Sequence, residues 1–190
     1  MTVKKVFFAL LLAVLPLSVN GQDVDISVAL SDDGSALVRE VWDLDISTGT
    51  EWCLVRSNLG DIRIKDLTVT DETGLAFENE GEWDVNRSMA QKAGRCGIVH
   101  KNDGCEICWG LGSYGHHVYT VSYTMTNAVK SMNDYDALHM QFVSPGIRPR
   151  IYHARVTVSA DGQELNDENT GIWAFGYEGT VDFMEGSIVA

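Results

Sequence analysis

The stretch "CGIVHKNDGCEICWGLGSYGHHVYTVSY", residues 96–123, decides the fold class because it combines a turn signal with cysteines and alternating apolar residues. Asn102, Asp103 and Gly104 accept left-handed backbone angles at low cost, which favours a tight turn. Apolar residues flank this turn on both sides, namely Ile98, Val99, Ile107 and Trp109. The stretch therefore predicts a β-hairpin folded about Asn102.

The predicted hairpin brings Cys96 opposite or nearly opposite Cys108. Facing residues of a non-hydrogen-bonded pair lie close enough for a disulfide, whose Cα atoms must be within about 7 Å. The chain has four cysteines, and four cysteines allow three pairings. We favour Cys96–Cys108, with Cys53–Cys105 as the second bond.

Zinc binding is the alternative interpretation, with ligands from Cys105, Cys108, His116 and His117. A second ligand pair at finger-like spacing is missing from the sequence. His116 and His117 are adjacent, so on a strand they point to opposite faces. A thioredoxin-like redox role for the Cys-x-x-Cys motif requires a βαβ setting, which the sequence lacks. We therefore expect no metal and no cofactor.

Apolar and polar residues also alternate outside the hairpin, which is typical of half-buried strands. Strands are predicted in segments 24–30, 37–42, 62–69, 117–125, 137–143 and 171–184, and segment 154–165 predicts a strand, a turn at Asp161–Gly162 and a short partner strand. A change of phase near Lys65–Asp66 indicates a bulge. Residues 127–136 lack this period and predict a loop or one helical turn. The pattern predicts an all-β fold, an antiparallel β-sandwich of immunoglobulin-like architecture, formed by one domain over residues 22–190.

The N-terminus has the layout of a secretory signal peptide over residues 1–21. Lys4 and Lys5 precede an apolar run from Val6 to Leu17, and small residues at Val19 and Gly21 mark a cleavage site. The run is shorter than the ~20 apolar residues that span a bilayer. We expect export to the periplasm, to the cell envelope or out of the cell, where disulfides persist.

The net charge of −13 excludes several partners. Loss of Lys4 and Lys5 with the signal peptide would lower it further. Binding to nucleic acids and anionic lipids depends on neutralisation by Lys and Arg. We expect no nucleic-acid partner, and contact with a membrane only through a C-terminal anchor that is absent from this chain.

Candidate ligand-binding residues follow the hairpin: Trp109, Tyr114, His116 and His117 could form an exposed aromatic platform for a glycan or peptide. For most tryptophans, however, packing in the core is the favoured interpretation. Ser113 and His116 lie close together, but no Gly-x-Ser-x-Gly motif accompanies them, so we interpret them as turn residues. A glycan hydrolase using carboxylates near the Trp109–His117 loop is the catalytic alternative, and it needs two acids across a cleft. Available acids are Glu40, Glu51, Glu82 and Glu106.

Several segments together resemble one family. "KAGRCGI", "EICWGLGSYG" and "HVYTVSYTM" are similar to the N-terminal extracytoplasmic domain of a bacterial predicted membrane protein family, domain of unknown function 2207. "DDGSALVREVWD", "GTEWCLVRSNLGDIRIKDLTV", "EWDVNRSMAQKAG" and "NDYDALHMQFV" fit the same pattern. The resemblance covers nearly all of residues 22–160. It implies an exported, mostly β domain that in many relatives precedes transmembrane helices, and it implies no known enzymatic activity.

The resemblance also bears on the cysteines and on function. Relatives are expected to carry an aromatic residue where this chain has Cys53 and Cys105, and two coupled replacements support their pairing. The chain is then either the N-terminal part of a membrane-anchored protein or a short free form. We expect a non-catalytic binding or structural module at the cell envelope, with an envelope protein or a glycan as partner.

Overall fold

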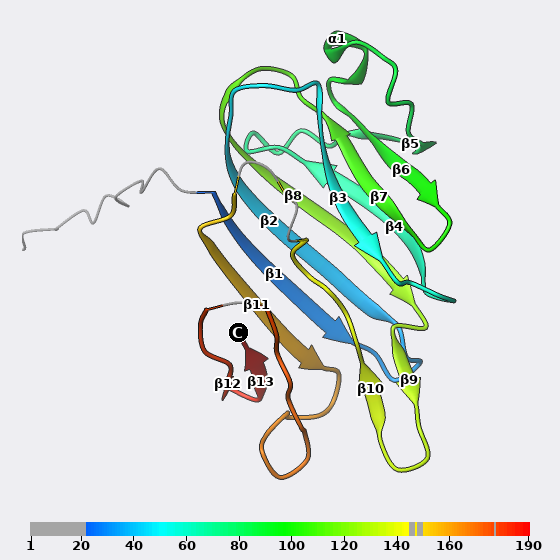
Figure 1. Ribbon diagram of the computed structural model, residues 1–190, viewed down its shortest axis with the longest axis vertical. Helices are drawn as coiled ribbons and strands as arrows, with labels where there is room; N and C mark the ends of the chain where they lie inside the picture. Colours follow the sequence, from blue (N-terminus) through cyan, green and yellow to red (C-terminus); the bar gives the residue numbers. More distant parts are fainter. Residues whose placement is uncertain (1–21, 145–146, 148–149, 177) are drawn as a thin grey trace, which may run out of the picture.

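Strands account for nearly all regular structure in the computed structural model, which describes residues 22–144, 147, 150–176 and 178–190 (Figure 1). The described chain contains one short helix, α1 (Met89–Lys92). No helix among these residues has the length and apolar character needed to cross a bilayer. The all-β prediction is confirmed, whereas the predicted signal peptide lies outside the described residues.

Two sheets of unequal size make up the body of the molecule. Within the described residues, the larger has seven strands in the order β12-β13-β11-β1-β2-β8-β4. These are β1 (Asp23–Leu30), β2 (Ala36–Ile46), β4 (Arg63–Thr70), β8 (Gly115–Thr126), β11 (His153–Ala160), β12 (Asp182–Met184) and β13 (Ser187–Val189). The smaller sheet has the order β3-β7-β6-β5. Its strands are β3 (Glu51–Ser57), β5 (Glu78–Glu82), β6 (Arg95–Lys101) and β7 (Gly104–Gly110). A separate hairpin pairs β9 (Val129–Ser131) with β10 (Asp136–Leu138).

The two sheets lie face to face (Figure 1). They share one core because each presents apolar side chains to the other. On β8 the alternating residues Tyr119, Val121, Tyr123 and Met125 form one face, which is buried throughout. The Tyr119 ring contacts Trp109 of β7, with ring centroids 5.5 Å apart. Trp42 of β2 contacts Trp52 of β3 at 6.2 Å. Aromatic contacts of this kind add to the free energy gained by burying the rings.

The strand directions differ from the prediction. β1 runs parallel to β11, and β5 runs parallel to β6, so the sheets are mixed and the exclusively antiparallel prediction is wrong. Alternation could not reveal this, because both pairings place side chains with the same period of two. Parallel neighbours need a long connection, which residues 31–152 provide between β1 and β11. The immunoglobulin-like architecture stays a prediction.

Local predictions had mixed outcomes. The bulge is confirmed, since the β4–β8 register shifts between Lys65 and Thr68 and Asp66 has a φ of 55°. The loop prediction for residues 127–136 is wrong, because β9 and the start of β10 form a hairpin there. Conversely, residues 139–143 are not a strand, and in segment 171–184 a described strand covers only Asp182–Met184. These short segments contain too few residues for alternation to be decisive.

Close backbone contact joins α1 to the small sheet at Gly110. A Cβ atom at Gly110 would lie 1.9 Å from the carbonyl oxygen of Lys92. The Lys92 ammonium group is buried and lies 2.9 Å from the Glu51 carboxylate, and it donates hydrogen bonds to Thr50 and to the carbonyl of Val85. The position therefore requires glycine for space, and the contact fixes the end of β7 from which the next loop starts.

Replacing Gly110 by alanine should lower the free energy of unfolding by about 3 kcal/mol, because the backbone of α1 must move to admit the methyl group. Gly112→Ala is the matched control, since a Cβ there would meet nothing within 4 Å. It should change stability by less than about 0.5 kcal/mol. Urea unfolding of the two variants measures the difference, and equal stabilities would contradict the packing at Gly110.

Candidate functional site

A buried ionic network connects the two sheets. Glu40 on β2 and Arg56 on β3 form an ion pair, with side chains 0% and 2% exposed. The other oxygen of the Glu40 carboxylate accepts a hydrogen bond of 3.0 Å from Trp42 Nε1. Tyr123 on β8 donates its hydroxyl to Glu40 at 2.5 Å and accepts a 3.0 Å hydrogen bond from Arg56 Nε. Each charge thus has several partners inside the core.

The network holds its members in defined protonation states. Burial alone lowers the pKa of Arg56, but the negative charge of Glu40 outweighs this and the pKa is raised. Burial also raises the pKa of Tyr123 far above its usual range, so the phenol stays neutral and donates. The network therefore contains one opposite-charge pair linked by a neutral hydroxyl, and it fixes β3 above β2 and β8.

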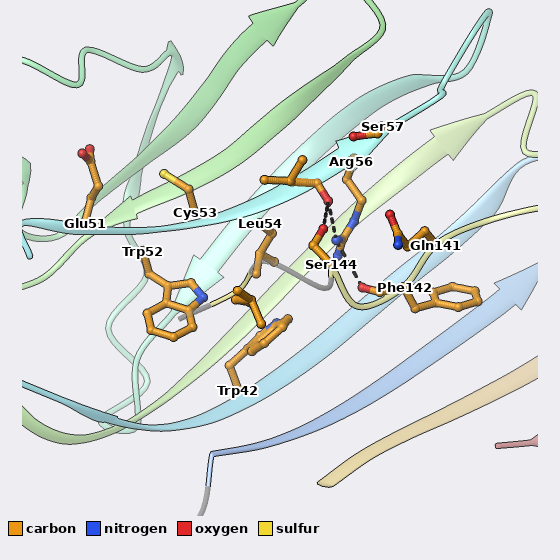
Figure 2. Close-up of a pocket in the computed structure, with 12 residues that line it drawn as sticks. Trp42, Glu51, Trp52, Cys53, Leu54, Arg56, Ser57, Gln141, Phe142 and Ser144 are labelled. Atoms are coloured by element: carbon orange, nitrogen blue, oxygen red, sulfur yellow. Dashed lines mark hydrogen bonds between the residues drawn. The ribbon is translucent and has the colours of Figure 1, made fainter. Parts of the chain in front are cut away.

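A pocket of about 510 Å³ opens beside this network, between β3 and the segment that contains Gln141, Phe142, Ser144 and Ile147 (Figure 2). Residues from both sheets and from the segment line it, among them Trp42, Trp52, Leu54, Arg56, Gln141 and Phe142. Hydrogen bonds hold the segment beside the edge of β3. Ser144 Oγ donates to the carbonyl of Val55 at 3.1 Å, and Arg56 donates to the carbonyl of Phe142 at 3.3 Å.

The lining of the pocket combines aromatic surface with a few polar atoms. Its volume falls within the range of small-molecule sites, roughly 300–1,000 Å³. Trp52 is 6% exposed, and its Nε1 has no hydrogen-bond partner in the described part of the chain. A buried donor without an acceptor costs about 1–3 kcal/mol. The Nε1 atom is itself covered, so an acceptor would remove this cost once the atoms around it moved aside.

The four predicted ligand-binding residues divide into two groups. Trp109 is fully buried between the sheets, so its assignment to an exposed platform is wrong. Tyr114, His116 and His117 lie on or next to the loop that joins β7 to β8. The Tyr114 hydroxyl donates to the carbonyl of Gly49 at 3.0 Å. Trp42, Trp52 and Trp83 are also buried, whereas Trp173 is 80% exposed.

The two histidines bind different carboxylates, as their opposite faces predict. His116 Nε2 lies 2.7 Å from Asp43, and His117 Nδ1 lies 3.1 Å from Glu72. The pKa of Glu72 is lowered: burial raises it, but hydrogen bonds from its own backbone N–H and from His117 outweigh this. A glycan hydrolase needs an acid with a raised pKa facing a second acid. Pairing each carboxylate with its own histidine does not provide this arrangement.

The sequence profile described as "Predicted membrane protein (DUF2207) N-terminal domain" matches residues 22–189. The chain belongs to this DUF2207 family. No curated protein matches the chain.

Structural neighbours of the DUF2207 domain are distant. Native yeast LTA4 hydrolase has a TM-score of 0.45 at 8% identity, over 74% of this chain and 23% of that one. A putative protease from Parabacteroides distasonis has a TM-score of 0.39 at 14% identity, over 89% and 34% of the two chains. A mutant M1 zinc metallopeptidase from Deinococcus radiodurans has a TM-score of 0.36 at 13% identity, over 89% and 37%. The chain thus spans 23–37% of the length of these proteins, and the likenesses are too weak to indicate a role.

The disulfide of the DUF2207 domain differs from both predicted bonds. Cys53 and Cys108 form it, with Cα atoms 4.1 Å apart, while Cys96 and Cys105 are free and buried. The predicted Cys96–Cys108 and Cys53–Cys105 pairings are therefore wrong.

The register of the hairpin explains the difference. The hairpin turn pairs Lys101 with Gly104, which places Cys96 opposite Trp109 and Gly97 opposite Cys108. Across β3 and β7, Cys53 lies directly opposite Cys108. A shift of one residue moves a side chain to the other face of a sheet. Cys96 and Cys105 consequently join the core, and Cys53 and Cys108 do not.

The same alternation separates the proposed zinc ligands. Cys105 belongs to the core face of β7, whereas Cys108 is bonded to Cys53. Cys53, Glu106 and Cys108 place their ligand atoms within 4.8 Å of one another among the described residues. Because the two sulfurs bond to each other, they are not thiolates and do not suit zinc.

Two sets of contacts were not predicted from the sequence, although Glu40 was considered as a catalytic acid. Glu40 and Arg56 occupy positions where the alternation of β2 and β3 calls for buried apolar side chains. A charge at such a position is a signal that a buried partner exists. Glu72 could not be connected to His117, because 45 residues separate them in the sequence.

Alkylation of the unfolded, non-reduced DUF2207 domain should label Cys96 and Cys105 and leave Cys53 and Cys108 linked in one peptide pair. In the folded protein neither thiol should react at neutral pH, since burial raises the pKa of both Cys96 and Cys105 to about 11. Peptide mass spectrometry measures both results. Label on Cys53 or Cys108 would contradict the assigned bond.

Proposed function

We propose that residues 22–190 form an exported binding domain of the bacterial cell envelope, and that its pocket beside β3 binds a ligand without a chemical step. The pocket beside β3 would bind a small molecule, or a side chain of a peptide, that combines a ring with a hydrogen-bond acceptor. The observation that carries this proposal is the pocket itself, which has aromatic walls and the Glu40–Arg56–Tyr123 network beside it.

Polar groups in the pocket favour recognition without a chemical step. The carboxylate of Glu51 is engaged by Lys92 and Trp83, and that of Glu40 is engaged by Arg56 and Tyr123. Cys53 is oxidised in the disulfide. The Trp52 N–H group and the Gln141 side-chain amide remain as groups that could orient a ligand.

Three observations support a location outside the cytoplasm. The family consists of predicted membrane proteins. The Cys53–Cys108 disulfide fits an oxidising compartment. The sequence of residues 1–21 has the layout of a signal peptide. An envelope ligand, such as a glycan-linked peptide of the cell wall, would meet the domain in that location.

Ligand-observed fluorine NMR tests the proposal with 4-fluorobenzoate, which has a ring and an acceptor, and with fluorobenzene, which has the ring alone. We expect line broadening with 4-fluorobenzoate and less with fluorobenzene. Trp52→Phe keeps a ring but removes the donor, and it should weaken 4-fluorobenzoate binding about 3- to 10-fold.

Trp173→Phe is the matched control, because Trp173 is exposed and does not line the pocket. It should bind like the natural protein. Soluble muropeptides extend the test to envelope ligands. If neither 4-fluorobenzoate nor the muropeptides bind, the pocket is not a binding site of this kind. The same conclusion follows if Trp52→Phe binds each of these ligands as tightly as the natural protein does.

A further inference from the structure

The loop after β7 and the turn after β4 bring a serine, a histidine and a carboxylate into one hydrogen-bonded line. Ser113 Oγ lies 3.3 Å from His117 Nε2. His117 Nδ1, on the other side of the ring, lies 3.1 Å from Glu72 Oε1. None of these residues lines the pocket beside β3, so the line is independent of the proposed ligand-binding site.

The His117 ring is held in place from several directions. It stacks on Tyr119, with centroids 5.7 Å apart and an interplanar angle of 29°. Its side chain is 15% exposed, whereas that of His116 is 58% exposed. The second oxygen of Glu72 accepts a long hydrogen bond of 3.4 Å from the Val118 backbone N–H. Both the ring and the carboxylate therefore have fixed orientations.

The carboxylate sets the tautomer of the ring. Hydrogen bonds from its own backbone and from His117 lower the pKa of Glu72 despite the opposing effect of burial, so this group is ionised at neutral pH. An ionised carboxylate keeps a proton on Nδ1 of a neutral imidazole. The unprotonated Nε2 then faces the Ser113 hydroxyl, which is the arrangement that activates a serine nucleophile.

We propose that Ser113, His117 and Glu72 form a nucleophile, base and acid relay that transfers the acyl group of small activated esters to water. Ser113 Oγ attacks the ester carbonyl carbon while its proton passes to His117 Nε2. The tetrahedral intermediate expels the alcohol or phenol, which takes that proton, and leaves the acyl group on Ser113. Water, deprotonated by His117, then attacks the acyl group, and the carboxylic acid and free Ser113 result.

The position of Ser113 limits the substrate. Ser113 is exposed on the loop, and it lines neither the pocket beside β3 nor a second hollow formed by residues 55–58 and 101–105. An ester with a good leaving group reacts without extensive binding contacts, so small aryl esters are the expected class. This activity goes beyond ligand binding at β3 and revises the expectation of a purely non-catalytic domain.

His116 provides an internal comparison. Like His117, it is bonded to a carboxylate, with 2.7 Å between Nε2 and Asp43. In His116 the Nε2 atom contacts the carboxylate, whereas in His117 the Nε2 atom faces Ser113. A role limited to loop structure would make the two histidines equivalent in reactivity, whereas the relay requires His117 alone.

Fluorophosphonate labelling and p-nitrophenyl acetate hydrolysis test the proposal on the secreted, signal-free protein. Mass spectrometry should find the phosphonate on Ser113, and p-nitrophenol release should exceed the buffer rate. Ser113→Ala should abolish labelling and the excess rate. His117→Asn should lower the rate about 100-fold, the lower end of the usual contribution of a general base.

Further variants separate a relay from a structural contact. Glu72→Gln should lower the rate at least tenfold, while His116→Asn should retain it, with circular dichroism confirming the fold of each. Binding of 4-fluorobenzoate should be unchanged by Ser113→Ala, so this proposal and the binding proposal can fail separately. Absence of labelling, labelling elsewhere, full hydrolysis by Ser113→Ala, or equal rates in the His116 and His117 variants would overturn the relay.

Discussion

The ion pair between Glu40 and Arg56 is the contact on which the arrangement of the two sheets depends. Removing both groups from water is costly, and their mutual attraction offsets this cost only with good geometry and further hydrogen bonds. Tyr123, Trp42 and the carbonyl of Phe142 supply those hydrogen bonds. The pair therefore favours one placement of β3 over the large sheet, because a displaced β3 would leave a charge buried without its partners.

Different interactions hold the two faces of β3 in place. Toward the core, Arg56 and the rings of Trp52 and Trp42 connect β3 to the large sheet. On the other face, the Cys53–Cys108 disulfide ties β3 to β7. The remaining edge of β3 lies beside residues 141–144, and the pocket forms there. An edge strand fixed in this way can border an open pocket without becoming mobile itself.

Alternation along the chain carried most of the correct predictions, and its limits explain the errors. The buried face of β8 and the bulge at Lys65–Asp66 follow from side-chain period alone. Strand direction does not affect this period, so the parallel pairing of β1 with β11 could not be predicted from the sequence. The hairpin was predicted correctly, but its register was wrong by one residue. The prediction placed Cys96 opposite Cys108, whereas Cys96 lies opposite Trp109, so the two cysteines point to opposite faces of the sheet.

The sites were harder to predict than the strands because they join distant parts of the chain. Ser113 and His117 are close in the sequence, so their loop could be considered as a candidate functional site from the sequence alone. Glu72 reaches them only because the turn after β4 lies beside the start of β8 in the large sheet. Likewise, Glu40 and Arg56 are charged residues at positions where the alternation of each strand predicts a buried side chain. The sequence does not show that these two strands face each other, because that depends on how the sheets pack.

A double-mutant cycle on Glu40 and Arg56 tests the role of the ion pair most directly. The unfolding free energies of the natural protein, Glu40→Gln, Arg56→Met and the double variant are compared in urea. Each single variant should lose about 3–5 kcal/mol, because it leaves the other group buried without its partner. The double variant should lose less than the sum of the two losses, by a coupling energy of at least about 2 kcal/mol. Additive losses, within about 0.5 kcal/mol, would show that the pair does not hold the sheets together.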